Sequence, residues 1–208
     1  MSGTGQMPSP STGGDAWRLD GRIALVTGAS AGLGARFVRV LHRAGAHVLA
    51  TARRADLLDG LAGECGERIE VMPGDITDTG HRQALVRRLA AHGRLDVLVN
   101  NAGICDDGPI EQQSLEDLRQ VIEVNLISVL DVCRLTAPLL SAAPPASVIN
   151  VASMYGVVSS RGPIHEHTLL ARTPALEEID GPLLFLATAA SSYMTGQALV
   201  IDGGWTAV

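Results

Sequence analysis

The chain has 208 residues, of which 46% are hydrophobic and 18% are charged, and it carries a net charge of −6. This length and composition are typical of one compact domain, and the negative charge argues against nucleic acid or an anionic membrane as a partner. The three cysteines, Cys65, Cys105 and Cys133, form no closely spaced pair. Free thiols in a reducing cytoplasm are therefore favoured over disulfides or a zinc site, and we expect no membrane-spanning segment.

The first 16 residues are rich in Ser, Gly, Pro and Thr. They lack the apolar centre of a signal peptide, so we expect a disordered lead-in followed by a single domain over residues 17–208.

From residue 23 onward, apolar runs of strand length alternate with segments of helical periodicity. The predicted strands are residues 23–27, 47–52, 69–72, 95–99, 147–152 and 198–201, and the predicted helices are residues 33–44, 55–62, 81–91, 114–140 and 183–186. Such alternation implies parallel strands joined by right-handed crossovers, with helices on both faces. We therefore predict a Rossmann-like, doubly wound α/β fold in three layers, whose ligands bind beyond the carboxyl ends of the strands.

A glycine-rich loop, residues 27–34 with the sequence TGASAGLG, joins the first predicted strand to the first helix. Glycines let the backbone approach a pyrophosphate, and a helix N-terminus offers unpaired N–H groups and the positive end of a dipole. The loop therefore indicates a phosphate site. A strand-to-helix turn without a ligand is the alternative.

Other polar side chains follow the ends of the neighbouring strands: Arg53, Asp75, Asn101 and Ser153. The carboxyl ends of parallel strands meet at one edge of a sheet, so we expect these residues to lie near the glycine-rich loop. Together with the loop, they indicate a dinucleotide site.

Taken together, these motifs resemble the short-chain dehydrogenase/reductase family. Residues 27–34 resemble its T-G-x-x-x-G-x-G cofactor loop, residues 100–103 its N-N-A-G motif, and Asn125 and Ser153 its catalytic Asn and Ser. Residues 195–197 and 202–204 resemble its C-terminal signature. The resemblance covers residues 19–162 and resumes for the C-terminal part up to residue 204.

The resemblance implies binding of a nicotinamide dinucleotide and hydride transfer to or from a ketone or secondary alcohol. Ser153 would hydrogen-bond the substrate oxygen, Asn125 would hold a water in a proton relay, and Asp75 would bind the adenine edge. The alternatives are an ordinary strand-end serine, a locally bonded helix Asn and a turn residue. The expected cofactor-binding residues are Gly28, Ser30, Ala31, Gly32, Leu33, Gly34, Arg53, Asp75, Ile76, Asn101, Ala102 and Gly103.

The end of the second predicted strand bears on the choice of nucleotide. NAD enzymes of this fold place an acid there, whereas this chain has Ala52 followed by Arg53 and Arg54. A guanidinium suits a 2′-phosphate, so NADP(H) is favoured and NAD(H) remains possible. The alternative is that two exposed arginines simply begin a solvated helix.

The chain departs from the family at the catalytic Y-x-x-x-K pair, because it contains no lysine. The only tyrosines, Tyr155 and Tyr193, do not match the family spacing, and both are expected to be packing residues. The sequence indicates a missing βα unit, on the order of 30 residues, and a missing substrate loop near residues 163–164, with a smaller loss near 174–175.

Two explanations of this break are open. In the first, the chain joins segments of a longer polypeptide that contains the Tyr and Lys, and the protein is an oxidoreductase. In the other, the shortening is genuine. In the second case the protein would be an inactive nucleotide-binding relative acting as a sensor or assembly partner.

We expect a small carbonyl or alcohol substrate. We also expect a homodimer or homotetramer that associates through the long helix, whose apolar residues are Leu118, Val121, Ile122, Leu126 and Val129. The alternative is that these residues pack on the sheet. No metal site is expected. In the segment His165-Glu166-His167, the two histidines would face apart on a helix, and no third ligand is near.

Overall fold

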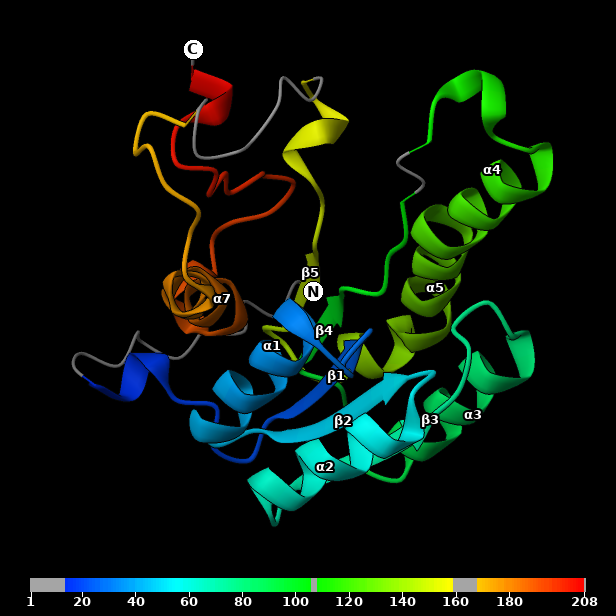
Figure 1. Cartoon of the computed structure of the whole chain (residues 1–208). Coiled ribbons are helices and arrows are strands. Elements are labelled where there is room, and N and C mark those ends of the chain that lie inside the picture. The colour runs from blue at the N-terminus through cyan, green and yellow to red at the C-terminus, as the bar shows by residue number, and fades with distance from the viewer. Residues whose placement is uncertain (1–13, 106–107, 159–167, 208) are drawn as a thin grey trace, which may run out of the picture.

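The computed structural model describes residues 14–105, 108–158 and 168–207. Within them lies one parallel sheet of five strands in the order β3-β2-β1-β4-β5 (Figure 1). The strands are β1 Ile23–Thr27, β2 His47–Ala52, β3 Ile69–Pro73, β4 Val97–Asn100 and β5 Ser147–Asn150. The predicted parallel α/β fold is therefore confirmed, with strand boundaries that differ by a few residues.

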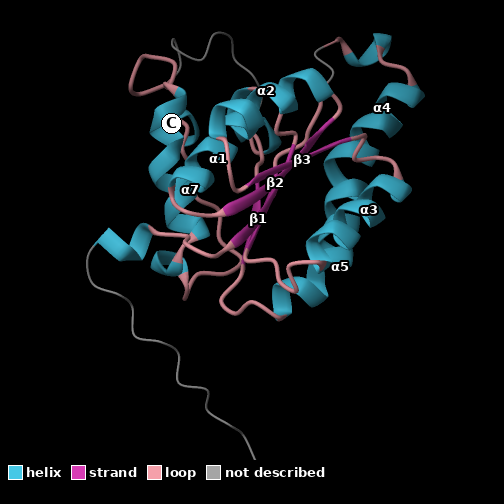
Figure 2. Ribbon diagram, turned by 90° about the horizontal axis from the view of Figure 1, so that it is seen from below, coloured by secondary structure: helices cyan, strands magenta, loops and turns pink. Residues whose placement is uncertain are grey.

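Helices cover both faces of the sheet, which makes the predicted three layers (Figure 2). The helices are α1 Gly32–Arg43, α2 Ala55–Cys65, α3 Thr79–Ala90, α4 Leu115–Ile122, α5 Ser128–Ser141 and α7 Asp180–Ala187. Figure 2 shows α1, α2 and α7 on one side of the strands and α3, α4 and α5 on the other.

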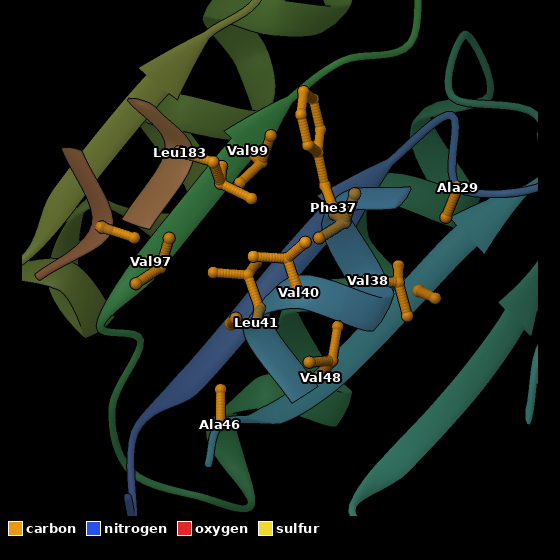
Figure 3. Packing of buried hydrophobic residues seen from close by; sticks show 14 of the residues in the cluster. Ala29, Phe37, Val38, Val40, Leu41, Ala46, Val48, Val97, Val99 and Leu183 are labelled. Atoms are coloured by element: carbon orange, nitrogen blue, oxygen red, sulfur yellow. The ribbon is translucent and has the colours of Figure 1, made fainter. Parts of the chain in front are cut away.

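The core consists of two apolar clusters, one on each face of the sheet. Val38 and Leu41 of α1 pack with Leu183 of α7 against β1, β2 and β4 (Figure 3). On the opposite face, Leu89 of α3 and Val132 of α5 pack with side chains of the same strands. All five residues of β1 are buried. A central strand that is covered on both faces requires apolar residues along its whole length, so this strand can be predicted from its sequence.

The long helix predicted over residues 114–140 is interrupted by one turn of π-helix, Glu123–Ile127, between α4 and α5. A capping box begins this helix: Ser114 Oγ accepts from the Asp117 N–H at 3.1 Å, and the Asp117 carboxylate accepts from the Ser114 N–H at 3.3 Å. Contrary to expectation, residues 115–141 are long and apolar enough to cross a membrane. Core helices meet the same criterion, so this finding assigns no membrane.

The predicted last strand, residues 198–201, is wrong. The structure places these residues in irregular chain, and Leu199, Val200 and Ile201 are exposed. A strand exists only through its ladder partners, and β5 is the outermost strand of the described sheet on that side. The segment has the composition of a strand, but no neighbouring strand in the described residues pairs with it.

Three regions that the sequence sets apart are the N-terminal lead-in and the predicted losses near residues 163–164 and 174–175. Residues 1–13 and the predicted break at 163–164 lie outside the described residues. Gly14–Trp17 form a short 3-10 helix, so the predicted disorder does not extend to residue 16. The predicted smaller loss at 174–175 falls in a loop before the 3-10 turn Leu176–Ile179, and it stays a prediction.

Candidate dinucleotide-binding and active site

A cavity of about 650 Å³ lies at the carboxyl ends of β1 to β4. It brings together all but Gly32 of the residues predicted to bind the cofactor. The lining consists of Gly28, Ser30, Ala31, Leu33, Gly34, Thr51, Ala52, Arg53, Arg54, Gly74, Asp75, Ile76, Asn101, Ala102, Gly103, Ile104 and Val124. Sequence reasoning missed Thr51, Gly74, Ile104 and Val124 as lining, because apolar and small residues carry no chemical signal.

The glycines of the loop are required by space at two positions and by conformation at a third. A Cβ on Gly28 would lie 2.8 Å from the Ala102 Cα, and a Cβ on Gly34 would lie 2.2 Å from the Gly28 carbonyl oxygen. Gly32 has φ +53° and open space around it. The α1 N-cap, Ala31, offers no side-chain hydrogen bond. Unpaired N–H groups beside open space are what an anionic phosphate needs, so the loop fits the predicted group.

The end of β4 is fastened to this loop by a reciprocal set of hydrogen bonds. Thr27 Oγ1 accepts from the backbone N–H groups of Asn101 and Ala102, each at 3.0 Å. Asn101 Nδ2 donates to the carbonyl oxygens of Thr27 at 3.0 Å and Gly28 at 3.2 Å. The Asn101 amide therefore shapes the loop. The sequence did not predict that the buried Thr27 hydroxyl accepts these two hydrogen bonds, because Thr27 was identified only as a member of the loop motif.

Two guanidinium groups stand at the mouth of the cavity beyond β2. Arg54 donates to Ser30 Oγ through Nη2 at 2.9 Å and Nε at 3.2 Å, which joins the β2 end to the glycine-rich loop. Arg53 is exposed, lines the cavity and makes no hydrogen bond or ion pair to another described side chain. Exposed guanidiniums facing a cavity make it attractive to a phosphate.

Asp75 shapes a turn and also lines the cavity, whereas its binding of adenine stays a prediction. Its Oδ1 accepts from the Thr77 N–H at 2.9 Å and the Thr77 hydroxyl at 2.8 Å, so it shapes a turn. It also lines the cavity. The Thr77 hydrogen bonds, chiefly that from the backbone, and the nearby charge of Arg53 hold the pKa of the carboxyl below its usual range against the opposing effect of burial. Asp75 is therefore an acceptor at neutral pH.

Asn125 stands in the π-helical turn, and its side chain reaches across to the chain that follows β4. Its Oδ1 accepts from the Ile104 N–H at 2.9 Å, and its Nδ2 donates to the Ile104 carbonyl oxygen at 2.7 Å. The amide bonds to a distant backbone segment and not to its own helix, contrary to the alternative of local bonding. Ile104 lines the cavity and Asn125 does not, so these bonds connect Asn125 to a segment of the lining.

Ser153 follows β5 and is exposed, outside the cavity lining. Its hydroxyl accepts from the Tyr155 N–H at 3.2 Å and caps the 3-10 turn Met154–Gly156. The ring of Tyr155 lies edge-on to the ring of Trp205, with 6.1 Å between the ring centroids, which agrees with a packing role for Tyr155. Tyr193 is fully exposed, so its expected packing role is wrong. The structure therefore does not gather the two predicted catalytic residues with the cavity.

The fold and the cavity together define a nucleotide-binding α/β protein of the Rossmann type. Residues 22–164 match the family model of short chain dehydrogenases, and the chain belongs to this family. The chain is 30% identical over 246 residues to the 3-oxoacyl-[acyl-carrier-protein] reductase FabG of Thermotoga maritima, a match covering 90% of this chain and 98% of that protein. It is 39% identical over 148 residues to nodulation protein G of a Rhizobium species, covering 70% of this chain and 60% of that protein.

Solved structures of the same family are similar throughout the fold. A gluconate 5-dehydrogenase from Burkholderia cenocepacia, in complex with NADP and tartrate, superposes with a TM-score of 0.85 at 25% identity, covering 93% of this chain and 98% of that one. A putative NAD(P)-dependent gluconate 5-dehydrogenase from Beutenbergia cavernae, with bound NADP, gives a TM-score of 0.83 at 29% identity, covering 93% and 100%. These enzymes are oxidoreductases.

The comparison with the Thermotoga reductase also measures how short this chain is. The aligned span is 246 residues, whereas 90% of the 208 residues here is about 187, so about 59 aligned positions fall opposite gaps in this chain. The family-model match ends at residue 164. Neither finding locates these gaps in the chain, so the shortening near residues 163–164 stays a prediction.

Proposed function

We propose that this chain binds NADP(H) in the cavity at the carboxyl ends of β1 to β4, as the first requirement of an oxidoreductase acting on a ketone or secondary alcohol. The observation that carries the proposal is the convergence of the glycine-rich loop, Arg53, Asp75 and the Asn101 segment on one cavity. The NADP complexes of the Burkholderia and Beutenbergia relatives support the same nucleotide.

Each part of the cavity suits one part of the nucleotide. The N-terminus of α1 at Gly32 would take the pyrophosphate, and Arg53 and Arg54 would take a 2′-phosphate. Asp75, with the adjoining Ile76, would meet the adenine. NAD(H) is the weaker alternative, because Ala52 offers no carboxylate for a ribose 2′-hydroxyl.

When bound, the nicotinamide cofactor supplies or accepts the hydride. The chain's own residues have more limited tasks. Asn125 holds the Ile104 segment that lines the cavity. The Ser153 hydroxyl would donate a hydrogen bond to the substrate oxygen, where negative charge develops. A proton donor of the Tyr–Lys type would come from an additional segment of the polypeptide near residues 163–164.

A nucleotide-binding relative without turnover is the second candidate function. It is favoured by the absence of lysine and by the position of Ser153 outside the cavity lining. NADPH titration together with a turnover assay on a panel of ketones and secondary alcohols separates the two. Binding with turnover supports the oxidoreductase, binding without turnover supports the second candidate, and no binding refutes both. Sequencing the native polypeptide through the Gly162 region then establishes whether it carries Tyr and Lys four residues apart.

We further propose a cytoplasmic, single-domain protein over residues 17–208 that forms a homodimer or homotetramer. Both core clusters pack on one sheet, and Cys65 and Cys133 are free thiols. Of the residues predicted for the interface, Ile122 and Leu126 are exposed, as is the neighbouring Leu130. An exposed apolar stripe on a long helix supports association through that helix. Sedimentation equilibrium measures the oligomeric state.

A further inference from the structure

Three side chains converge at the end of the sheet opposite to the nucleotide cavity. His47 is the first residue of β2, Glu70 is the second residue of β3, and His92 follows the C-terminal end of α3. The register pairs Leu49 with Glu70, so these two side chains share a face, and His47, two residues before Leu49, shares it too. Leu89 of α3 packs on that face with Leu49, which brings the end of α3, and with it His92, to the same place.

The nitrogen and oxygen atoms of the three side chains are close enough to share one ion. His47 Nε2 lies 2.6 Å from Glu70 Oε1, and His92 Nε2 lies 3.3 Å from the same oxygen. One ligand atom from each residue lies within 4.8 Å of the others, and the two imidazole centroids are 4.8 Å apart. The side chains are 27%, 18% and 25% exposed, so they are held by their surroundings and still open to a small ion.

Two imidazole nitrogens and one carboxylate oxygen are a ligand set that suits Zn²⁺ and its neighbours among the divalent transition metals. Ligand distances of about 2.0–2.2 Å place the ligand atoms of a tetrahedral zinc site roughly 3.3 Å apart. The observed atoms reach that arrangement through side-chain adjustments on the order of 1 Å. Three protein ligands leave the fourth position to water.

The surroundings keep Glu70 ready to act as a ligand. Arg88 and His47 both contact the Glu70 carboxylate and hold it in place. Arg88 donates to Oε2, whereas both imidazoles approach Oε1. The oxygen needed by a metal is therefore the one that faces the histidines.

We propose that His47, Glu70 and His92 bind one divalent transition-metal ion, for which Zn²⁺ is the fitting probe. The site joins β2, β3 and the end of α3, and it is independent of the nucleotide cavity and of the proposed oxidoreductase function. A bound ion stabilises the native chain, because these three residues come together only when the sheet has formed. The sequence alone gave no hint of the site, since 22 residues or more separate each pair of ligands.

The test is an isothermal calorimetric titration of the untagged, metal-stripped full chain with Zn²⁺ alone at pH 7.5. We expect one saturable site in the wild type, with a Zn²⁺ affinity at least tenfold weaker in His92→Gln and in His47→Gln. His42→Gln is the matched control. His42 Nε2 contacts the Glu67 carbonyl oxygen and not the cluster, so this variant keeps wild-type affinity.

Three further measurements distinguish a metal site from a charge network or from zinc held by cysteines. Zn²⁺ should raise the Tm of the wild type and of His42→Gln but not of His92→Gln, and circular dichroism checks that each variant is folded. Arg88→Gln should bind Zn²⁺ more tightly, because a positive charge leaves the carboxylate. NADPH affinity should be the same in His92→Gln and wild type. Absence of saturable Zn²⁺ binding, or binding unchanged in both His47→Gln and His92→Gln, would overturn the proposal.

Discussion

Gly34 lies so close to Gly28 that a Cβ on Gly34 would be 2.2 Å from the Gly28 carbonyl oxygen and 2.5 Å from Asn101 Nδ2. The first turn of α1 thus packs directly against the end of β1 and against the side chain that fastens β4 to it. The shape of the nucleotide cavity depends on this contact between two backbones.

Replacing Gly34 by Ala should therefore displace the glycine-rich loop and weaken NADPH binding at least tenfold, with a loss of unfolding free energy of about 1–3 kcal/mol from overpacking. Calorimetric titration and urea unfolding measure the two effects. Gly63→Ala is the matched control: Gly63 lies inside α2, nothing stands within 4 Å of its added Cβ, and the change should add about 0.5–1 kcal/mol of stability. Unchanged NADPH affinity in Gly34→Ala would show that the loop does not hold the nucleotide.

Arg53 should decide the choice between the two nicotinamide nucleotides. Arg53→Ala removes a guanidinium that would pair with the 2′-phosphate, so NADPH affinity should fall about tenfold, or ~1.4 kcal/mol, while NADH affinity stays the same. Arg43→Ala, an exposed arginine in the last turn of α1, should alter neither affinity. Equal losses for NADPH and NADH would contradict a 2′-phosphate contact.

Asp96 links stability to pH at the opposite end of the sheet. It is 2% exposed and accepts from Arg22 at 2.6 Å, from Arg94 at 2.5 Å and from the Ile23 N–H at 2.9 Å. Burial raises the pKa of its carboxyl, but the hydrogen bonds from Arg94, Ile23 and Arg22 outweigh that effect, and the pKa lies below its usual range.

Because the pKa is lower in the folded chain, the stabilisation from Asp96 should be complete above the unfolded value of about 3.9 and should be lost as pH falls through the folded value. Asp96→Asn should lower the unfolding free energy at pH 7 by roughly 2–4 kcal/mol and flatten its decline in acid. Urea unfolding between pH 7 and pH 3 measures both. The control is Asp20→Asn, which breaks an exposed ion pair with Arg18 and should change the unfolding free energy little. An equal acid slope in Asp96→Asn and wild type would rule out this role.

Ser153 separates binding from turnover. Ser153→Ala should leave the Kd for NADPH unchanged, because Ser153 lies outside the cavity lining. Where turnover is detected, kcat should fall by about 10²–10³-fold, as for the loss of one donor to a developing oxyanion. Stopped-flow measurement of NADPH oxidation reports kcat separately from KM. A kcat within twofold of wild type would remove Ser153 from the reaction.

The sequence predicts the sheet well where burial dictates composition. Ile23 to Thr27 is mostly apolar because both faces of β1 are covered, and the glycines of the following loop mark a close approach of backbone segments. The prediction fails where structure depends on a distant partner. Residues 198–201 have strand composition but find no neighbouring strand in the described sheet.

Site geometry was less accessible to sequence reasoning than the fold. The π-helical turn at Asn125 has no signature in hydrophobic periodicity, and the reach of its amide to Ile104 depends on how β4 ends. The Thr27 hydroxyl and the His47–Glu70–His92 cluster likewise follow from strand register, which composition does not encode.

The most direct test of the account is one calorimetric titration of the intact chain with NADPH, alongside Gly34→Ala and Arg53→Ala. The account predicts saturable binding of one nucleotide per chain, tighter for NADPH than for NADH, and weakened for NADPH at least tenfold in Gly34→Ala and about tenfold in Arg53→Ala. Absence of saturable NADPH binding by the folded wild-type chain would contradict it.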